Sequence, residues 1–204
     1  MCQFVETIRI KDGIAMNMKY HLKRLNRTRE NFWPGCRKIE ANELIKNIPS
    51  SNSLQKLRVT YNENIITRDI SPYIRKNIET LAIVESNTVD YTWKSTNRDE
   101  LTLLRAQATS YADEVIIIKN GYVTDTSYTN ICFFDGKEWF TPDTPLLRGT
   151  MRKFLLDKGV IRETKIQKTD IRHFQKVSLI NAMMELGEII IPTENIKGID
   201  ENSL

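Results

Sequence analysis

The sequence predicts an α+β or α/β fold in two domains, from three observations. Short runs of β-branched and aromatic residues recur along the 204-residue chain, as they do in strands. Asn120-Gly121 and Asp135-Gly136 lie between such runs, and pairs of this kind favour the tight turns of hairpins. Other segments repeat apolar residues at helical spacing. A charged connection over residues 71–77 separates these elements, so we expect domains at residues 1–76 and 77–204.

Composition argues against several classes of function. The net charge of +4 comes from Lys and Arg scattered among Asp and Glu, so no nucleic-acid partner is expected. Three widely spaced cysteines and two histidines predict neither a disulfide framework nor a metal site. No apolar run is long enough to span a membrane and no signal peptide is visible, so we expect a cytoplasmic protein.

The N-terminal domain is predicted to combine a sheet with one long helix. Residues 3–10 alternate as a strand does, and residues 17–33 carry an apolar helical stripe that begins after Asn17, a residue suited to capping. Pro34-Gly35 ends this helix. The remaining expected elements are a short helix over 41–48 and strands over 54–61 and 65–70.

Lys94 is the first candidate for chemistry. It follows a short strand expected over 90–94, stands next to Trp93, and precedes a helix that Ser95 or Thr96 can cap. An aromatic neighbour and a helix N-terminus both lower the pKa of a lysine, and only the neutral amine attacks an aldehyde. The alternative is an ordinary surface lysine with its amine in water.

A second candidate region follows the Asn120-Gly121 turn. Its strands direct Asp125 and Asn130 towards one region, and a helix that begins after Gly149-Thr150 runs to Gly159. Backbone N–H groups at such a helix start can bind an anion, while a nearby acid can pair with a basic ring nitrogen. Read alone, this region favours the ordinary interpretation, a solvated Asp and a common helix start without a ligand.

The rest of the chain supplies strands and a short helix. Thr169 or Asp170 is expected to start that helix, and Met183 and Met184 are expected to fill the core. Strands are expected over 81–84, 161–166, 177–181 and 188–191.

Six segments, taken together and in this order, resemble the class IV aminotransferase family. They are Val5-Glu6-Thr7-Ile8-Arg9, His21-Leu22-Lys23-Arg24-Leu25, Lys94-Ser95-Thr96-Asn97-Arg98, residues 121–130, Arg148-Gly149-Thr150-Met151-Arg152 and Asn181-Ala182-Met183-Met184. The resemblance covers nearly the whole chain. It implies a two-domain fold-type IV enzyme, similar to D-amino acid aminotransferase, with a shortened N-terminal part.

The resemblance also implies the cofactor and its ligands. Family members use pyridoxal 5′-phosphate, bound to a Schiff-base lysine that Lys94 matches, and they are usually homodimers. Asp125 matches the acid that pairs with the pyridine nitrogen, although the family usually has the longer Glu there. Thr7 and Arg9 are expected to face the substrate. The expected cofactor-binding residues are Arg24, Asp125, Asn130, Gly149, Thr150, Met151 and Asn181.

Within the family, the Lys-x-x-Asn-Arg segment at Lys94 is most similar to lyases that split 4-amino-4-deoxychorismate into 4-aminobenzoate, a folate precursor, and pyruvate. An aminotransferase acting on branched-chain or D-amino acids would share every cofactor residue and is the alternative. A third hypothesis is a protein that binds the cofactor without turnover, motivated by the short N-terminus and by Asp125.

Overall fold

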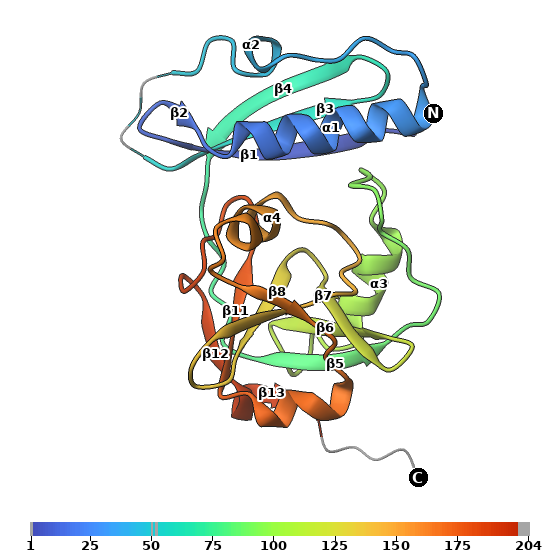
Figure 1. Cartoon of the computed structure of the whole chain (residues 1–204), viewed down its shortest axis with the longest axis vertical. Coiled ribbons are helices and arrows are strands. Elements are labelled where there is room, and N and C mark those ends of the chain that lie inside the picture. Colours follow the sequence, from blue (N-terminus) through green and yellow to red (C-terminus); the bar gives the residue numbers. More distant parts are fainter. Residues whose placement is uncertain (1, 50, 52, 200–204) are drawn as a thin grey trace. The chain divides into compact units, whose positions relative to one another are not determined.

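The structure is a computed structural model that describes residues 2–49, 51 and 53–199 (Figure 1). The chain forms two compact units. The first consists of Met1–Arg75 and Trp93–Asn97, and the second of Lys76–Thr92 and Arg98–Leu204. The sequence-based boundary at 76/77 lies next to this division, but Lys94 belongs to the first unit, although it lies C-terminal to the boundary.

The first unit is an antiparallel sheet with α1 along one face (Figure 1). Its strand order is β2-β1-β3-β4, and β1 pairs with β3 over seven residue pairs from Phe4–Tyr61 to Ile10–Gln55. The elements are β1 (Phe4–Lys11), β2 (Ile14–Ala15), α1 (Met18–Phe32), α2 (Ala41–Leu44), β3 (Gln55–Tyr61) and β4 (Ile65–Pro72).

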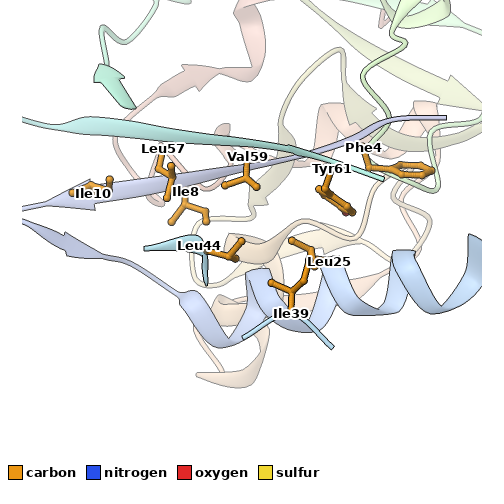
Figure 2. Packing of buried hydrophobic residues seen from close by; sticks show 9 residues of the cluster. All are labelled: Phe4, Ile8, Ile10, Leu25, Ile39, Leu44, Leu57, Val59 and Tyr61. Carbon is orange, nitrogen blue, oxygen red and sulfur yellow. The ribbon is translucent and has the colours of Figure 1, made fainter. Parts of the chain in front are cut away.

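The core of this unit lies between the sheet and α1, as Figure 2 shows. Alternation along β1 places its apolar side chains on the face that meets the helix. From the helix side, Leu25 is fully buried among them. The labelled core residues are Phe4, Ile8, Ile10, Leu25, Ile39, Leu44, Leu57, Val59 and Tyr61.

The second unit contains two mixed sheets, with orders β13-β5-β6-β7 and β10-β9-β8-β11-β12. Parallel pairs β5–β6 and β9–β10 are each connected through a helix, α3 and α4 respectively, whereas β6–β7 and β8–β9 are antiparallel hairpins. The elements are β5 (Leu81–Glu85), α3 (Asp99–Ala106), β6 (Glu114–Lys119), β7 (Tyr122–Thr126), β8 (Asn130–Phe134), β9 (Trp139–Pro142), α4 (Thr150–Asp157), β10 (Arg162–Thr164), a 3-10 helix (Lys168–His173), β11 (Lys176–Ile180), β12 (Ile190–Pro192), a second 3-10 helix (Thr193–Asn195) and β13 (Ile196–Lys197).

The predicted mixed fold class is therefore confirmed, as are its turn signals. Asn120 and Gly121 have φ angles of 52° and 80°, both in the left-handed region that the β6–β7 turn requires. Gly159 ends α4 with φ 66°, as expected for a glycine just after a helix.

Three local predictions were wrong. Asn17 precedes α1, but its backbone has φ 55° and its side chain makes no capping hydrogen bond. The second helix ends at Leu44 instead of continuing to residue 48. No strand forms over 90–94, because within that stretch the backbone turns before it pairs with β1 at Ser95.

Candidate active site

A buried carboxylate in the first unit binds two basic side chains of α1. Glu6 lies on β1, on the face shared with Phe4 and Ile8, and is completely buried. Its Oε2 atom is 2.6 Å from Nδ1 of His21. Arg24 donates from Nε to Oε1 at 2.8 Å and from Nη2 to Oε2 at 2.6 Å, a bidentate pair.

The charges of this cluster follow from its surroundings. Burial alone raises the pKa of Glu6, but the charge of Arg24 and hydrogen bonds from His21 and Arg24 outweigh it and lower the pKa to about 2. Burial lowers the pKa of His21, and the nearby charges of Arg24 and Lys94 lower it further, against the opposing effect of Glu6. His21 is therefore neutral at pH 7. Because an ionised carboxylate only accepts hydrogen bonds, Nδ1 carries the proton.

Lys94 belongs to the same unit because its backbone pairs with β1. Its carbonyl accepts the N–H of Val5 at 2.9 Å, and the N–H of Thr96 donates to the carbonyl of Gln3 at 2.9 Å. The side chain is half-buried, and its charge acts on His21. These contacts place Lys94 near the Glu6 cluster, which the sequence did not predict.

The expected helix start beside Lys94 is wrong. Helix α3 begins at Asp99, five positions later, and neither Ser95 nor Thr96 caps it. Instead, Thr96 Oγ1 donates to the carbonyl of Gln3 at 3.2 Å. The segment at Ser95 and Thr96, which was expected to lead directly into the helix, instead pairs with β1.

A second buried carboxylate, Asp125, lies at the end of β7 in the second unit. Its Oδ1 accepts a hydrogen bond from Asn130 Nδ2 at 2.7 Å. The two side chains, which the sequence was expected to direct towards one region, therefore lie in direct contact. Its Oδ2 accepts the backbone N–H of Leu147 at 2.8 Å. Asn130 Nδ2 also donates to the carbonyl of Leu147 at 2.8 Å. The backbone of Leu147 is thus bound through both its N–H and its carbonyl.

Burial dominates the electrostatics of Asp125. It raises the pKa of this carboxyl to about 6, even though the N–H of Leu147, the amide of Asn130 and the charge of Arg152 each act to lower it. Arg152 is itself buried and donates to the carbonyl of Pro142 and to Glu163, both at 2.6 Å.

Gly149 packs directly against Asn130. A Cβ atom at this position would lie 1.9 Å from Asn130 Oδ1, so only glycine fits. Thr150 and Met151 follow as the first residues of α4, and both are buried. The first turn of a helix presents N–H groups that have no acceptor within the helix. This turn therefore has the donors that an anion such as a phosphate needs.

The remaining predicted residues occupy varied positions. Thr7 and Arg9 lie on the face of β1 opposite Glu6, and Arg9 is buried. Asn181 uses its side-chain oxygen to accept the N–H of Met183 at 2.8 Å, within its own turn. Met183 and Met184 are buried, as expected for core residues. The substrate or cofactor roles predicted for Thr7, Arg9 and Asn181 stay predictions.

Sequence analysis did not single out Glu6 as a site residue, although it belongs to a quoted motif. The available signal was its alternation with Phe4, Ile8 and Ile10 on a strand face, because a carboxylate in an apolar row requires a buried partner. Leu147 carried no signal at all, since its contribution is made by its backbone.

Two kinds of feature are absent from the residues that the structure describes. Across residues 2–49, 51 and 53–199, no group of His, Cys, Asp and Glu is arranged to hold a metal ion. Within the same residues, no helix is both long enough and apolar enough to cross a membrane.

Comparison with known proteins identifies the family. A family model described as "Amino-transferase class IV" matches residues 3–190. A Haemophilus influenzae protein described as uncharacterized is 36% identical, covering 90% of this chain and 98% of its own. A Schizosaccharomyces pombe protein named "putative aminodeoxychorismate lyase" is 27% identical, covering 90% and 88%. The chain therefore belongs to the class IV aminotransferase family.

Solved structures agree with this assignment. A "putative 4-amino-4-deoxychorismate lyase" from Haemophilus somnus has a TM-score of 0.86 and 32% identity, covering 91% of this chain and 98% of its own. A "hypothetical aminotransferase" from Mycobacterium tuberculosis, in a form with bound pyridoxal phosphate, shares the fold with a TM-score of 0.78 at 17% identity, covering 96% and 81%. Pyridoxal phosphate is the cofactor of this family of enzymes, so the predicted cofactor is confirmed at that level.

The residues present fit such a cofactor. Gly149 leaves the start of α4 clear of a side chain, and Asp125 offers a buried carboxylate in the same unit. Lys94 is half-buried and would supply the amine that an aldehyde group requires.

Proposed function

We propose that the protein is a lyase that splits 4-amino-4-deoxychorismate into 4-aminobenzoate and pyruvate. The observation that carries the proposal is the near full-length similarity, at 32% identity, to the Haemophilus somnus protein named for this activity. The Schizosaccharomyces pombe relative, with the same activity in its name, supports it. So does the Lys94-Ser95-Thr96-Asn97-Arg98 segment, which is similar to that of lyases.

In this proposal Lys94 holds the cofactor through its ε-amine, and Thr150 and Met151 bind the phosphate through their backbone N–H groups at the start of α4. Arg24 would add a positive charge for the phosphate, and Asp125 would face the ring nitrogen. When bound, pyridoxal phosphate supplies a sink for the electron pair released at the substrate carbon that bears the nitrogen.

The chain's own residues then move the proton. Lys94, displaced by the amine of the substrate, takes the proton from the carbon that bears the nitrogen. The C–O bond to the enolpyruvyl group breaks, and that group leaves as enolpyruvate, which gains a proton to become pyruvate. The remaining ring becomes aromatic, which makes the step favourable. Neutral His21 leaves Glu6 and Arg24 as the ionised members of the nearby cluster.

The decisive experiment follows pyruvate with a coupled dehydrogenase assay after 4-amino-4-deoxychorismate is added to the protein loaded with pyridoxal phosphate. Release of pyruvate and 4-aminobenzoate is expected for the wild type and is expected to be lost in Lys94→Ala. Lys137→Ala changes an exposed lysine in the β8–β9 turn and serves as the control. Glutamate formation from 2-oxoglutarate and an amino acid, without pyruvate release, would favour an aminotransferase instead. Cofactor binding with neither product would favour a protein without turnover.

Two further features belong to this proposal. We propose a homodimer, as is usual in the family, with a sedimentation mass about twice the 23.8 kDa of one chain. We also propose that the protein acts in the cytoplasm and supplies 4-aminobenzoate for folate synthesis. Rescue of a strain that requires 4-aminobenzoate, by the wild type and not by Lys94→Ala, tests the second point.

A further inference from the structure

The loop that leads into α4 is fastened to β7 at two points. We call residues 143–149, between β9 and α4, the α4 entry loop. Near its beginning, Thr144 Oγ1 donates to the carbonyl of Val123 at 3.0 Å. Near its end, the N–H of Leu147 donates to Asp125 Oδ2 at 2.8 Å. The loop therefore takes its position from β7.

The second fastening is a closed set of hydrogen bonds. Asp125 binds the N–H of Leu147, Asn130 binds its carbonyl, and Asn130 also donates to the other oxygen of Asp125 at 2.7 Å. Both oxygens of the carboxylate thus accept a donor from the protein itself. Asp125 and Asn130 are 4% and 5% exposed, so water does not replace these bonds easily.

Gly149, the residue before the first residue of α4, packs against Asn130, so these hydrogen bonds also position the start of the helix. Gly149, two residues after Leu147, has no room for a Cβ because Asn130 Oδ1 would lie 1.9 Å from it. The positions of Asn130 and Leu147 therefore constrain the backbone immediately before Thr150, where the N–H groups of α4 begin.

We infer that Asp125 and Asn130 are positioning residues for the phosphate-binding turn, so that Asp125 acts on the phosphate end of the cofactor through Leu147 and Gly149. This inference rests on the proposed function, because it takes the start of α4 to be the phosphate site. This positioning role is additional to the one proposed for Asp125 at the ring nitrogen, because it acts on the phosphate group. The shorter Asp, in place of the Glu usual in the family, suits a carboxylate that binds its own neighbouring loop.

Two probes separate these roles: pyridoxal phosphate, and pyridoxal, which has the same ring and aldehyde but no phosphate. Dissociation constants for both are measured by titration calorimetry on the full-length protein freed of cofactor. In Asp125→Asn we expect affinity for pyridoxal phosphate to fall about tenfold more than affinity for pyridoxal. The variant weakens the bond between the charged carboxylate and the N–H of Leu147, which positions the phosphate-binding turn. An equal loss for both probes would overturn the inference and leave Asp125 with the proposed role at the ring alone.

Two more variants keep the test independent of how well Asp125→Asn folds. Asn130→Ala removes both bonds that Asn130 makes, and Gly149→Ala forces Asn130 and the loop apart while leaving Asp125 intact. Each is expected to show the same phosphate-selective loss, and non-selective loss in both would overturn the inference. Asp157→Asn, an exposed change on α4 itself, is the matched control and is expected to leave both affinities unchanged.

Failure of the positioning role can be distinguished from failure of the proposed function. A wild type that binds pyridoxal phosphate no better than pyridoxal would remove the phosphate site and with it the proposed function. A wild type that prefers pyridoxal phosphate, combined with variants that weaken both probes equally, would overturn only the positioning role.

Discussion

At the residue scale, Glu6 shows how a buried charge depends on its partners. It is fully buried, yet the two α1 side chains that bind it keep its pKa near 2. Breaking one partner of a buried ion pair leaves the other charge uncompensated, which costs more than the pair itself contributes. Without the Glu6 carboxylate, the charge of Arg24, whose side chain is only 14% exposed, would be left uncompensated.

We therefore predict that Glu6→Gln lowers the free energy of unfolding by about 3 kcal/mol at pH 7. The folded pKa of about 2 lies below the unfolded value of 4.5, so the contribution of Glu6 is present above about pH 4.5 and is lost as the pH falls towards 2. Urea unfolding of both proteins at pH 7 and pH 3 measures this, and the two should differ less at pH 3. Glu30→Gln, an exposed change on α1, should match the wild type. A Glu6→Gln protein as stable as the wild type at pH 7 would contradict the prediction.

Asp125 has the opposite pH dependence, because its folded pKa of about 6 lies above the ordinary value of 3.8. The folded state then holds the proton more tightly than the unfolded state, so the free energy of unfolding falls as the pH rises from about 4 to 6. We predict that the wild type loses about 3 kcal/mol relative to Asp125→Asn between pH 4 and pH 7. Chemical denaturation at unit pH steps measures the difference, and Asp157→Asn should keep the wild-type slope. Parallel curves for wild type and Asp125→Asn would show that the carboxyl keeps its ordinary pKa.

At the scale of elements, the β6–β7 hairpin depends on its turn. It contributes the internal strand β6 and the edge strand β7 of one sheet in the second unit. Asp125 is the penultimate residue of β7, so the register of the hairpin fixes where that carboxylate lies. The turn needs positive φ at Asn120 and Gly121. Residues other than Gly, Asn and Asp rarely adopt such a backbone conformation.

We predict that Gly121→Ala lowers the free energy of unfolding by about 1 to 2 kcal/mol, because φ 80° is strained for any residue with a Cβ. The space around Gly121 is open, so the loss would come from the backbone and not from a clash. Asn120→Gly, which keeps the left-handed conformation, is expected to stay close to the wild type. Urea denaturation measures all three proteins, and an equal loss in both variants would contradict the backbone explanation.

At the scale of the whole molecule, the units each carry part of the predicted chemistry. Lys94 and the Glu6 cluster belong to the first unit, whereas Asp125 and the start of α4 belong to the second. A ligand that binds only the folded protein stabilises it by mass action, in proportion to the logarithm of its concentration.

We predict that pyridoxal phosphate, at 100 times its dissociation constant, stabilises the wild type by about 2.7 kcal/mol. Lys94→Ala should gain less at the same concentration, because the ligand loses its bond to the amine. Denaturation with and without added cofactor measures both gains, with Lys137→Ala as the control. Equal stabilisation of wild type and Lys94→Ala would remove Lys94 from the cofactor site.

Much of the site could be predicted from the sequence because its signals are local. Asp125 and Asn130 are five positions apart across a short turn, so strand and turn patterns alone direct both towards one region, and the structure adds the hydrogen bond between them. Motif order was enough to indicate the family. In contrast, the strand and cap expected around Lys94 were wrong, because propensity over a few residues did not anticipate the competing pairing with β1.

The sequence by itself therefore determined the mixed fold class, the hairpin turns, the family and the direction of Asp125 and Asn130 towards one region. Only the tertiary structure decided that Glu6 binds side chains 15 and 18 positions away, that Lys94 lies in the first unit, and that Leu147 is held by its backbone. The physical reason is the distance along the sequence over which each kind of interaction acts. Turn and periodicity signals act between near neighbours, whereas a buried charge or a backbone N–H takes its partner from whichever distant segment the packing brings beside it.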